Sequence, residues 1–222
     1  LPQGVLAGLT ADLNLIATAP HLLPGWLRMP QAHRVVGPVY ARLPGELPEF
    51  LADLVAGPQP LVYFAMGSSG NRDLVLHVLA GLGRADCQVL APVRSHLRQE
   101  DLETLPRNVH VTDWIPAHQL GDAVDLAITH GGEGTVQTSC VQGWPFIGIP
   151  LQFEQRFNVQ RCVAFGSARL VSQREARRAD WAELVRQALA DNGMRSRARR
   201  MAGLMEGLDG PGRAAEAICE LL

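Results

Sequence analysis

A histidine followed directly by a glycine-rich turn is the clearest chemical feature of this 222-residue chain. Residues 130–135 read HGGEGT, and they follow an apolar run, Asp125 to Thr129, that is typical of a buried strand. Glycines let backbone amides approach a ligand, and the first turn of a helix offers unpaired N–H groups to an anion. We therefore expect an anion site with His130 bonding a phosphate oxygen. The pattern is neither G-x-G-x-x-G nor a Walker loop.

Two weaker features follow other strand-like runs. Gly67-Ser68-Ser69-Gly70 comes after the apolar run Leu61 to Ala65, where serine hydroxyls and glycine amides can meet a ligand, although such turns are common. Trp114 and Ile115 follow the run Asn108 to Thr112. The indole offers a flat face to a base and the backbone of Ile115 can pair with its edge. Taken alone, Trp114 is better explained as a core residue.

An acid and an amide stand side by side just past a further strand. Glu154 and Gln155 follow the run Phe146 to Ile149, with Asn158 one turn later. Neighbouring sugar hydroxyls need both acceptors and donors, and this pair supplies both. An equally good explanation is a helix N-terminus with its own acidic residue in the first turn.

The elements that must position these residues alternate along the chain. Apolar runs separated by helical patterns predict a parallel sheet covered on both faces, in right-handed β-α-β units. The fold class is therefore α/β, a Rossmann-like doubly wound sheet with a helical C-terminal segment. The strands are Leu61–Ala65, Cys87–Ala91, Asn108–Thr112, Asp125–Thr129 and Phe146–Ile149. The helices include a segment with Leu74, Val75, Val78, Leu79 and Leu82 on one face, and the segments Gly134–Val141, Gln155–Ala164, Arg174–Ala190, Ser196–Leu208 and Gly212–Leu222.

The first sixty residues differ from the rest because many of the 15 prolines lie there. One strand-like run, Leu13 to Ala17, precedes a stretch punctuated by proline, which predicts the end of one domain followed by a linker. The chain begins with Leu1 and lacks a signal-peptide pattern, so we expect a piece of a longer cytoplasmic protein.

Composition excludes several classes of function. The net charge is −2, which gives no basic field for nucleic acid. All 20 basic residues are Arg, so a P-loop lysine and a Schiff-base lysine are excluded. No apolar run is long enough to cross a bilayer.

The four cysteines are far apart in the sequence, which favours reduced, mostly buried thiols over a disulfide framework or a metal site.

Taken together, these motifs resemble the donor-binding C-terminal domain of family 1 glycosyltransferases of the GT-B fold. That family includes bacterial antibiotic and macrolide glycosyltransferases. The resemblance covers about Val35 to Leu222, and Val36-Gly37-Pro38 is similar to the interdomain segment of the family. The motifs that carry it, in order, are Trp114, His130-Gly131-Gly132, Gly143-x-Pro145, Pro150 and Glu154-Gln155.

The resemblance implies a role for each motif residue. Trp114 would stack on the nucleobase, with the backbone of Ile115 at its edge. His130 would contact the diphosphate. Amides of the following loop would also meet the phosphates, and the sugar hydroxyls would lie against an acid and an amide. The expected donor-binding residues are Gly67, Ser68, Trp114, Ile115, His130, Gly132, Gly134, Thr135, Thr138, Glu154 and Gln155.

One departure from the family pattern concerns the nucleotide. Eight residues after the motif histidine, enzymes that use UDP-sugars usually carry a Glu that holds both ribose hydroxyls, and this chain has Thr138. Deoxyribose lacks the 2′-hydroxyl, so such a carboxylate would remain partly unpaired. The resemblance therefore favours a dTDP-sugar over a UDP-sugar. No D-x-D motif occurs, and the resemblance implies no metal and no cofactor besides the nucleotide-sugar substrate.

We expect residues 1–58 to be the end of an N-terminal acceptor domain with its linker, and residues 59–222 the donor-binding domain. The resemblance implies an inverting glycosyltransferase acting on a small-molecule or lipid hydroxyl. Its general base would lie in an acceptor domain missing from this chain, and nothing links His21 or His33 to that role. Two alternatives remain: a non-catalytic nucleotide-sugar-binding subunit or activator, and a nucleotide-sugar epimerase of the same fold.

Overall fold

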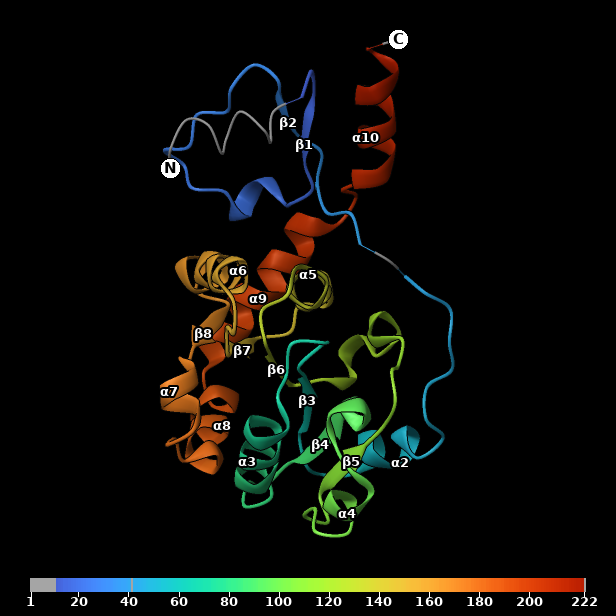
Figure 1. Ribbon diagram of the computed structural model, residues 1–222, viewed down its shortest axis with the longest axis vertical. Coiled ribbons are helices and arrows are strands. Elements are labelled where there is room, and N and C mark those ends of the chain that lie inside the picture. The colour runs from blue at the N-terminus through green and yellow to red at the C-terminus, as the bar shows by residue number, and fades with distance from the viewer. Residues whose placement is uncertain (1–10, 41, 222) are drawn as a thin grey trace. The chain divides into compact units, whose positions relative to one another are not determined.

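A computed structural model describes residues 11–40 and 42–221 of the chain. The chain divides into two compact units (Figure 1). The larger unit is Arg42–Gly203, and the smaller combines the described parts of Leu1–Ala41 and Leu204–Leu222. Every residue of the expected donor site lies in the larger unit.

The larger unit is built on a parallel sheet with the strand order β5-β4-β3-β6-β7-β8 (Figure 1). From β3 the chain first builds outward through β4 to β5, and then returns to add β6 on the other side of β3. Ligands of open α/β sheets bind beyond the carboxyl ends of the strands at such a reversal. The expected Rossmann-like doubly wound class is therefore confirmed. The strands are β3 (Leu61–Ala65), β4 (Gln88–Ala91), β5 (Val109–Val111), β6 (Leu126–Thr129), β7 (Phe146–Gly148) and β8 (Ala168–Leu170).

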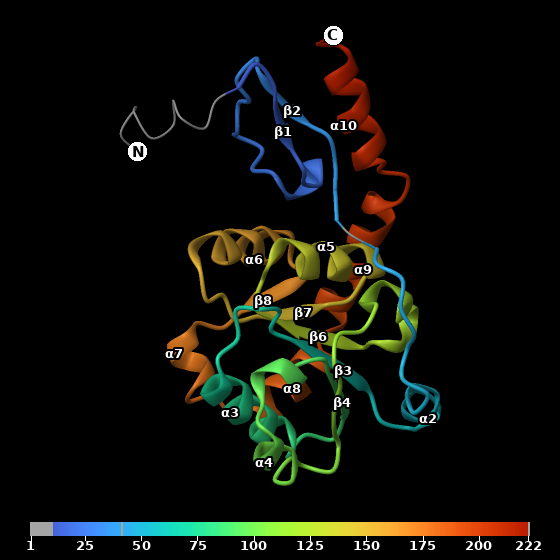
Figure 2. The same ribbon diagram turned by 45° about the vertical axis from the view of Figure 1, so that its right-hand side comes forward.

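Helices cover both faces of this sheet (Figure 2). Because side chains alternate along a strand, Val62 and Phe64 of β3 face one helical layer, while the Tyr63 ring lies 5.7 Å from the Trp144 ring in the other. The first layer includes α3 and α8, and the second includes α5 and α6. The helices of this unit are α2 (Leu51–Ala56), α3 (Arg72–Leu82), α4 (Gln99–Leu102), α5 (Glu133–Gln142), α6 (Phe153–Phe165), α7 (Gln173–Ala176), α8 (Trp181–Leu189) and α9 (Asn192–Met205, which extends into the smaller unit).

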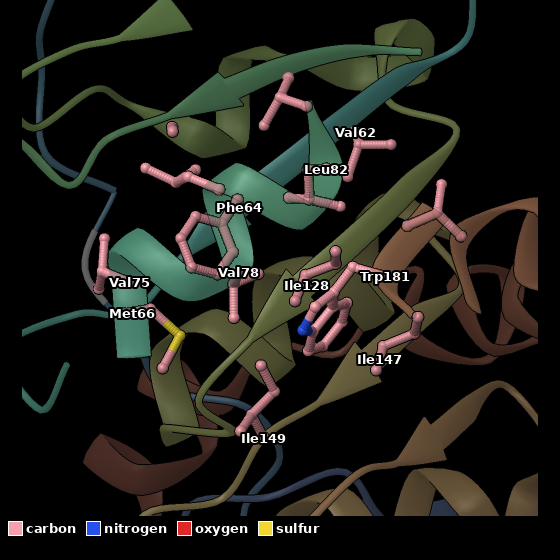
Figure 3. Close-up of a cluster of buried hydrophobic side chains, with 14 of the residues drawn as sticks. Val62, Phe64, Met66, Val75, Val78, Leu82, Ile128, Ile147, Ile149 and Trp181 are labelled. Atoms are coloured by element: carbon pink, nitrogen blue, oxygen red, sulfur yellow. The ribbon is translucent and has the colours of Figure 1, made fainter. Parts of the chain in front are cut away.

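The main hydrophobic core lies between the sheet and the pair α3 and α8 (Figure 3). Trp181 is fully buried at its centre, and its Nε1 donates a hydrogen bond to the carbonyl of Ala176 at 2.9 Å. Gly81 allows the two helices to approach, because a Cβ there would lie 2.8 Å from the Cβ of Trp181. The helical spacing predicted which side of α3 is buried: Leu74, Val75, Val78, Leu79 and Leu82 are all 0% exposed.

The structure confirms the five strands predicted in this unit to within one residue, and it adds the short strand β8, which was not predicted. The expectation of one helix over Arg174–Ala190 is wrong. Ser172 accepts a hydrogen bond from the amide of Glu175 to begin α7, and Asp180 similarly begins α8. Asn192-Gly193 does not separate helices either, because Asp191 accepts a hydrogen bond from the amide of Met194 and caps α9.

The smaller unit pairs β1 (Asn14–Ile16) with β2 (His33–Val35) in parallel. Its C-terminal helix, α10 (Gly210–Cys219), is capped by Asp209, and Pro211 occupies its first turn. Arg34 of β2 forms an ion pair with Glu220. Gly37 has φ +105°, and a Cβ there would lie 3.6 Å from the Cα of Gly210, so this part of the Val36-Gly37-Pro38 segment lies against the start of α10.

The four cysteines are free thiols. Three are buried and Cys219 is exposed, as the sequence predicted. The sulfur atoms of Cys140 on α5 and Cys162 on α6 lie 3.7 Å apart. This contact, together with burial, raises the pKa of Cys140. No helix of the described residues is both long and apolar enough to cross a membrane.

Candidate functional site

Two parts of the expected site lie beyond the carboxyl ends of β3 and β6. These strands are neighbours, and Ala65 pairs with Thr129 in the parallel register. The turn after β3 and the turn after β6 therefore begin side by side, at the point where the strand order reverses. Gly67 and Ser68 lie in the first turn, and His130 opens the second.

The His130 imidazole lies between two glycines. A Cβ on Gly67 would be 2.6 Å from Cε1 of the ring, and a Cβ on Gly132 would be 2.3 Å from its Nε2. Neither distance is possible between real atoms, so a side chain at either glycine would displace the imidazole. Gly67 also has φ +52°, a conformation that residues with a Cβ rarely adopt. The glycines predicted as ligand amides thus also make room for the histidine.

His130 is 7% exposed, and its Nδ1 is buried without a hydrogen-bond partner among the described residues. Burial is the largest influence on this side chain and lowers its pKa. The backbone of Ala65 and the charge of Glu154 act in the opposite direction, and His96 lowers the pKa further. Burial therefore favours the neutral form of this ring in the free protein.

The loop after β6 is held in place by threonine hydroxyls. Thr129 Oγ1 lies 2.8 Å from Thr135 Oγ1 and accepts a hydrogen bond from the amide of Gly131, while Thr135 Oγ1 donates to the carbonyl of Gly132. Gly132 is the N-cap of α5, and no side chain caps that helix. The first intrahelical bond comes from Val136, so the amides of the first turn have no partner within the helix. This arrangement favours an anion.

Helix α6 supports the same loop from the side. Gly131 has φ +85°, and a Cβ there would lie 2.6 Å from Cγ2 of Val159. Gly148 on β7 leaves room for the same valine. Asn158 donates a hydrogen bond from Nδ2 to the carbonyl of Gly131 at 3.2 Å. Sequence reasoning noted Asn158 as a neighbour of the acid–amide pair, but it gave no role to Val159.

Glu154 and Gln155 occupy different environments at the start of α6. Gln155 is 2% exposed, and its Oε1 accepts hydrogen bonds from the amides of Leu151 and Gln152. Its Nε2 donates to Ser69 Oγ at 3.1 Å, which ties α6 to the turn after β3. The side chain of Glu154 is exposed, and its charge raises the pKa of His130.

Glu133, which lies in the glycine-rich turn, and Thr138, which was expected near the ribose, are both on α5. Glu133 is exposed, and its carboxylate accepts a hydrogen bond from Nε2 of Gln137, one turn further along the helix. Thr138 donates from Oγ1 to the carbonyl of Gly134 at 2.8 Å. Its hydroxyl is thereby engaged within α5, and it places no charge there.

Trp114 is 60% exposed, so the structure excludes the core-residue explanation. Ile115 beside it is 5% exposed, and its carbonyl accepts a hydrogen bond from the amide of Ala117. A Cβ on Gly45 would lie 3.0 Å from Cζ3 of Trp114, and Gln119 donates a hydrogen bond to the carbonyl of Gly45. The residues before α2 therefore pack against the edge of the indole.

Two polar residues of this region were missed by sequence reasoning. Ser69, rather than its neighbour Ser68, bonds Gln155, while Ser68 is exposed. His96 lies beyond β4, and its Nε2 is 2.7 Å from the carbonyl of Gly67. The only signal in the sequence for His96 was its place shortly after a predicted strand, which many polar residues share.

Residues 76–221 match the family described as "Erythromycin biosynthesis protein CIII-like, C-terminal domain". The chain belongs to this family. The match covers the expected site from Trp114 to Gln155, and the resemblance to family 1 glycosyltransferases is confirmed.

Curated relatives carry names that agree with this family. The chain is 29% identical over 191 residues to the PGL/p-HBAD biosynthesis rhamnosyltransferase of Mycobacterium bovis (strain BCG / Pasteur 1173P2), covering 86% of this chain and 41% of that protein. It is 32% identical over 180 residues to 4′-demethylrebeccamycin synthase of Lentzea aerocolonigenes, covering 77% and 42% respectively. The chain thus spans about two fifths of the length of these relatives.

Solved structures of glycosyltransferases share the fold. The calicheamicin glycosyltransferase CalG4 matches with a TM-score of 0.77 at 22% identity, over 98% of this chain and 54% of that one. The spinosyn rhamnosyltransferase SpnG complexed with thymidine diphosphate matches with a TM-score of 0.75 at 20% identity, over 95% and 57%. VinC in complex with dTDP matches with a TM-score of 0.69 at 20% identity, over 88% and 48%.

Proposed function

We propose that this chain is the donor-binding part of an inverting glycosyltransferase that uses a dTDP-sugar. The observation that carries the proposal is the position of His130, in a chain of this family. A buried, neutral imidazole lies between Gly67 and Gly132 and beside the uncapped N-terminus of α5. An N-terminus with free amides and an imidazole lying directly beside it together suit a diphosphate.

In this proposal each residue has a distinct task. Trp114, which is exposed, provides the stacking surface for the base beside Ile115. The amides of Gly134 and Thr135 and the imidazole of His130 stabilise the negative charge that grows on the leaving diphosphate. Glu154 accepts hydrogen bonds from sugar hydroxyls. Gln155 positions α6 through Ser69 and joins the sugar contact through its amide. The turn at Gly67 and Ser68 closes the phosphate side.

Support for thymidine nucleotides comes from two sources. Thr138 places no carboxylate at the position where UDP-dependent relatives hold the ribose, and its hydroxyl is engaged with Gly134. In addition, the solved VinC and SpnG structures contain dTDP or thymidine diphosphate. The acceptor is a small-molecule or lipid hydroxyl, and the acceptor pocket with its general base belongs to a domain outside this chain. We place the boundary of the donor-binding part near residue 58.

A non-catalytic nucleotide-sugar-binding subunit would use the same donor site. The names of the relatives favour transfer over that alternative and over an epimerase. An upstream acceptor domain with a histidine base in the complete gene would support the enzyme, whereas a gene without one would support the binding subunit.

The test is a binding panel of dTDP, UDP, GDP and ADP, first by thermal shift and then by calorimetry. A ligand at one hundred times its dissociation constant adds about 2.7 kcal/mol of stability, which a thermal shift detects readily. We expect dTDP to bind at least as tightly as UDP. Thr138→Glu should move the preference toward UDP by roughly ten- to a hundredfold, the worth of one charge-assisted hydrogen bond. Strong preference of the unmodified chain for UDP would contradict the assignment.

A matched pair of glycines tests where the diphosphate lies. A Cβ at Gly134 on α5 or at Gly203 on α9 meets no protein atom within 4 Å. Alanine at either position should therefore stabilise its helix by about 0.5–1 kcal/mol. Only Gly134→Ala places a methyl group beside the proposed phosphates, so it alone should weaken dTDP binding, by roughly tenfold or more. Equal affinities of both variants would contradict the placement.

A further inference from the structure

A second histidine meets the site from a different strand. His96 ends the short 3-10 helix η2 (Arg94–His96), which follows β4, the other neighbour of β3. Its Nε2 lies 2.7 Å from the carbonyl oxygen of Gly67. Because a carbonyl oxygen can only accept, Nε2 of His96 carries the proton and donates it. The bond joins residues 29 positions apart in the sequence.

The turn that receives this bond has little freedom. Gly67 has φ +52°, and its Cα lies so close to the ring of His130 that there is no room for a Cβ. At the other end of the turn, a Cβ on Gly70 would lie 3.3 Å from both Cε1 and Nε2 of His96. The His96 ring therefore packs against both ends of the turn, from Gly67 to Gly70.

The two imidazoles thus lie next to the same residue of the turn, Gly67. His96 bonds the carbonyl of Gly67, while His130 lies against the Cα of the same residue. His96 is also near enough to contribute to the lowered pKa of His130. Rotation of the peptide after Gly67 would break the His96 bond and move the turn relative to the ring of His130. His96 therefore restrains the conformation that leaves the His130 ring in place.

We infer that His96 is a positioning residue of the diphosphate site, which it serves by fixing the turn at Gly67 against the His130 imidazole. The inference rests on the proposed function, because it takes a nucleoside diphosphate as the ligand. His96 acts through the turn, so its contribution concerns the diphosphate and leaves the nucleoside contacts at Trp114 unchanged. Without the hydrogen bond from His96, the turn at Gly67 is less restrained in the free protein. The nucleoside diphosphate then binds more weakly, because binding must also order the turn.

The experiment compares His96→Gln, His96→Asn and His96→Leu. A glutamine amide reaches about as far as Nε2 of histidine and can donate to the carbonyl of Gly67, whereas asparagine is too short and leucine has no donor. Affinities for dTDP and for thymidine are measured by calorimetry or NMR titration. We expect His96→Asn and His96→Leu to bind dTDP roughly three- to tenfold more weakly, the worth of one hydrogen bond, with thymidine unchanged. His96→Gln should restore most of the dTDP affinity.

A control separates this role from a general effect on stability. His77 is an exposed histidine on α3, and His77→Leu should leave both affinities and the midpoint of urea unfolding unchanged. Equal losses for dTDP and thymidine in the His96 variants, or wild-type dTDP affinity in His96→Leu, would overturn the inference. The absence of dTDP binding by the unmodified chain would instead overturn the proposed function.

A second measurement does not depend on any ligand. Nitrogen-15 NMR of the free protein above pH 8 reports which ring nitrogen of each neutral histidine carries the proton. We expect the Nε2-protonated form for His96, since that nitrogen donates to Gly67. The Nδ1-protonated form would remove the hydrogen bond on which the inference depends.

Discussion

At the scale of single residues, the site depends on space left by missing side chains. Gly67 and Gly132 leave room for the His130 ring, and Gly131 leaves room for Val159. The glycines thus determine where the imidazole lies as well as which amides are exposed. An alanine at Gly67 or Gly132 would need the ring to move, so these positions affect the diphosphate through the histidine.

The protonation of His130 should respond to the diphosphate. Burial lowers the pKa of the free histidine below its usual 6.5, whereas an adjacent anion favours the charged form and raises the pKa in the complex. At a pH between the pKa of the free histidine and its pKa in the complex, binding should therefore be accompanied by proton uptake. The affinity for dTDP should rise as the pH falls from 8 to about 6.5, above the phosphate's own pKa of about 6.

Calorimetry in two buffers of different ionisation enthalpy measures this proton uptake directly. Among the described residues, His96 and Glu154 are the other titratable groups that influence His130. Uptake at pH 7 should be largely lost in His130→Gln. Tight dTDP binding without any proton uptake in the unmodified chain would mean that His130 does not meet the phosphates.

The sequence could predict His130 and its glycines because they are consecutive and follow a recognisable strand. It could not predict what holds them in place. Gln155 and Ser69, which join α6 to the turn after β3, are 86 positions apart, and His96 meets Gly67 from another strand. Such contacts depend on the strand order, in which β3 lies between β4 and β6, and no local pattern reports that order.

At the scale of elements, long periodic segments were predictable and short ones were not. The buried face of α3 follows from apolar residues at helical spacing. Strand β8 has three residues, Ala168–Leu170, with Arg169 at its centre, which is too short and too polar to stand out. The division between α7 and α8 also escaped prediction. Asp180 caps α8 by accepting a hydrogen bond from the amide of Glu183, so a new helix begins at Trp181.

The crossing of α3 and α8 provides a test of this packing. Alanine at Gly81 would place a Cβ 2.8 Å from the Cβ of Trp181 and 3.0 Å from its Cδ1. Gly81→Ala should therefore destabilise the fold by about 1–3 kcal/mol through overpacking, despite the better helix propensity of alanine. Urea unfolding measures this, with Gly203→Ala as the control that should be neutral or stabilising. A more stable Gly81→Ala variant would mean that α8 lies further from α3.

At the scale of the whole molecule, binding and transfer are separable. Within the proposed function, every donor contact lies in the larger unit, Arg42–Gly203, at the carboxyl edge of one sheet. The chain spans about two fifths of the length of its curated relatives. The proposal places the acceptor pocket in a domain outside this chain. The donor site therefore needs nothing from that domain in order to bind nucleotide.

This separation predicts that the chain binds dTDP but transfers no sugar. A positioned general base contributes roughly 10²–10⁴-fold to a transfer rate, and no residue of this chain is assigned that role. Slow hydrolysis of a dTDP-sugar should persist, because water can attack the anomeric carbon without an acceptor. Release of dTDP from a dTDP-sugar, with and without a phenolic acceptor, measures both reactions. Acceptor-dependent release would place a base within these 222 residues, and His21→Ala and His33→Ala would then show whether either histidine is that base.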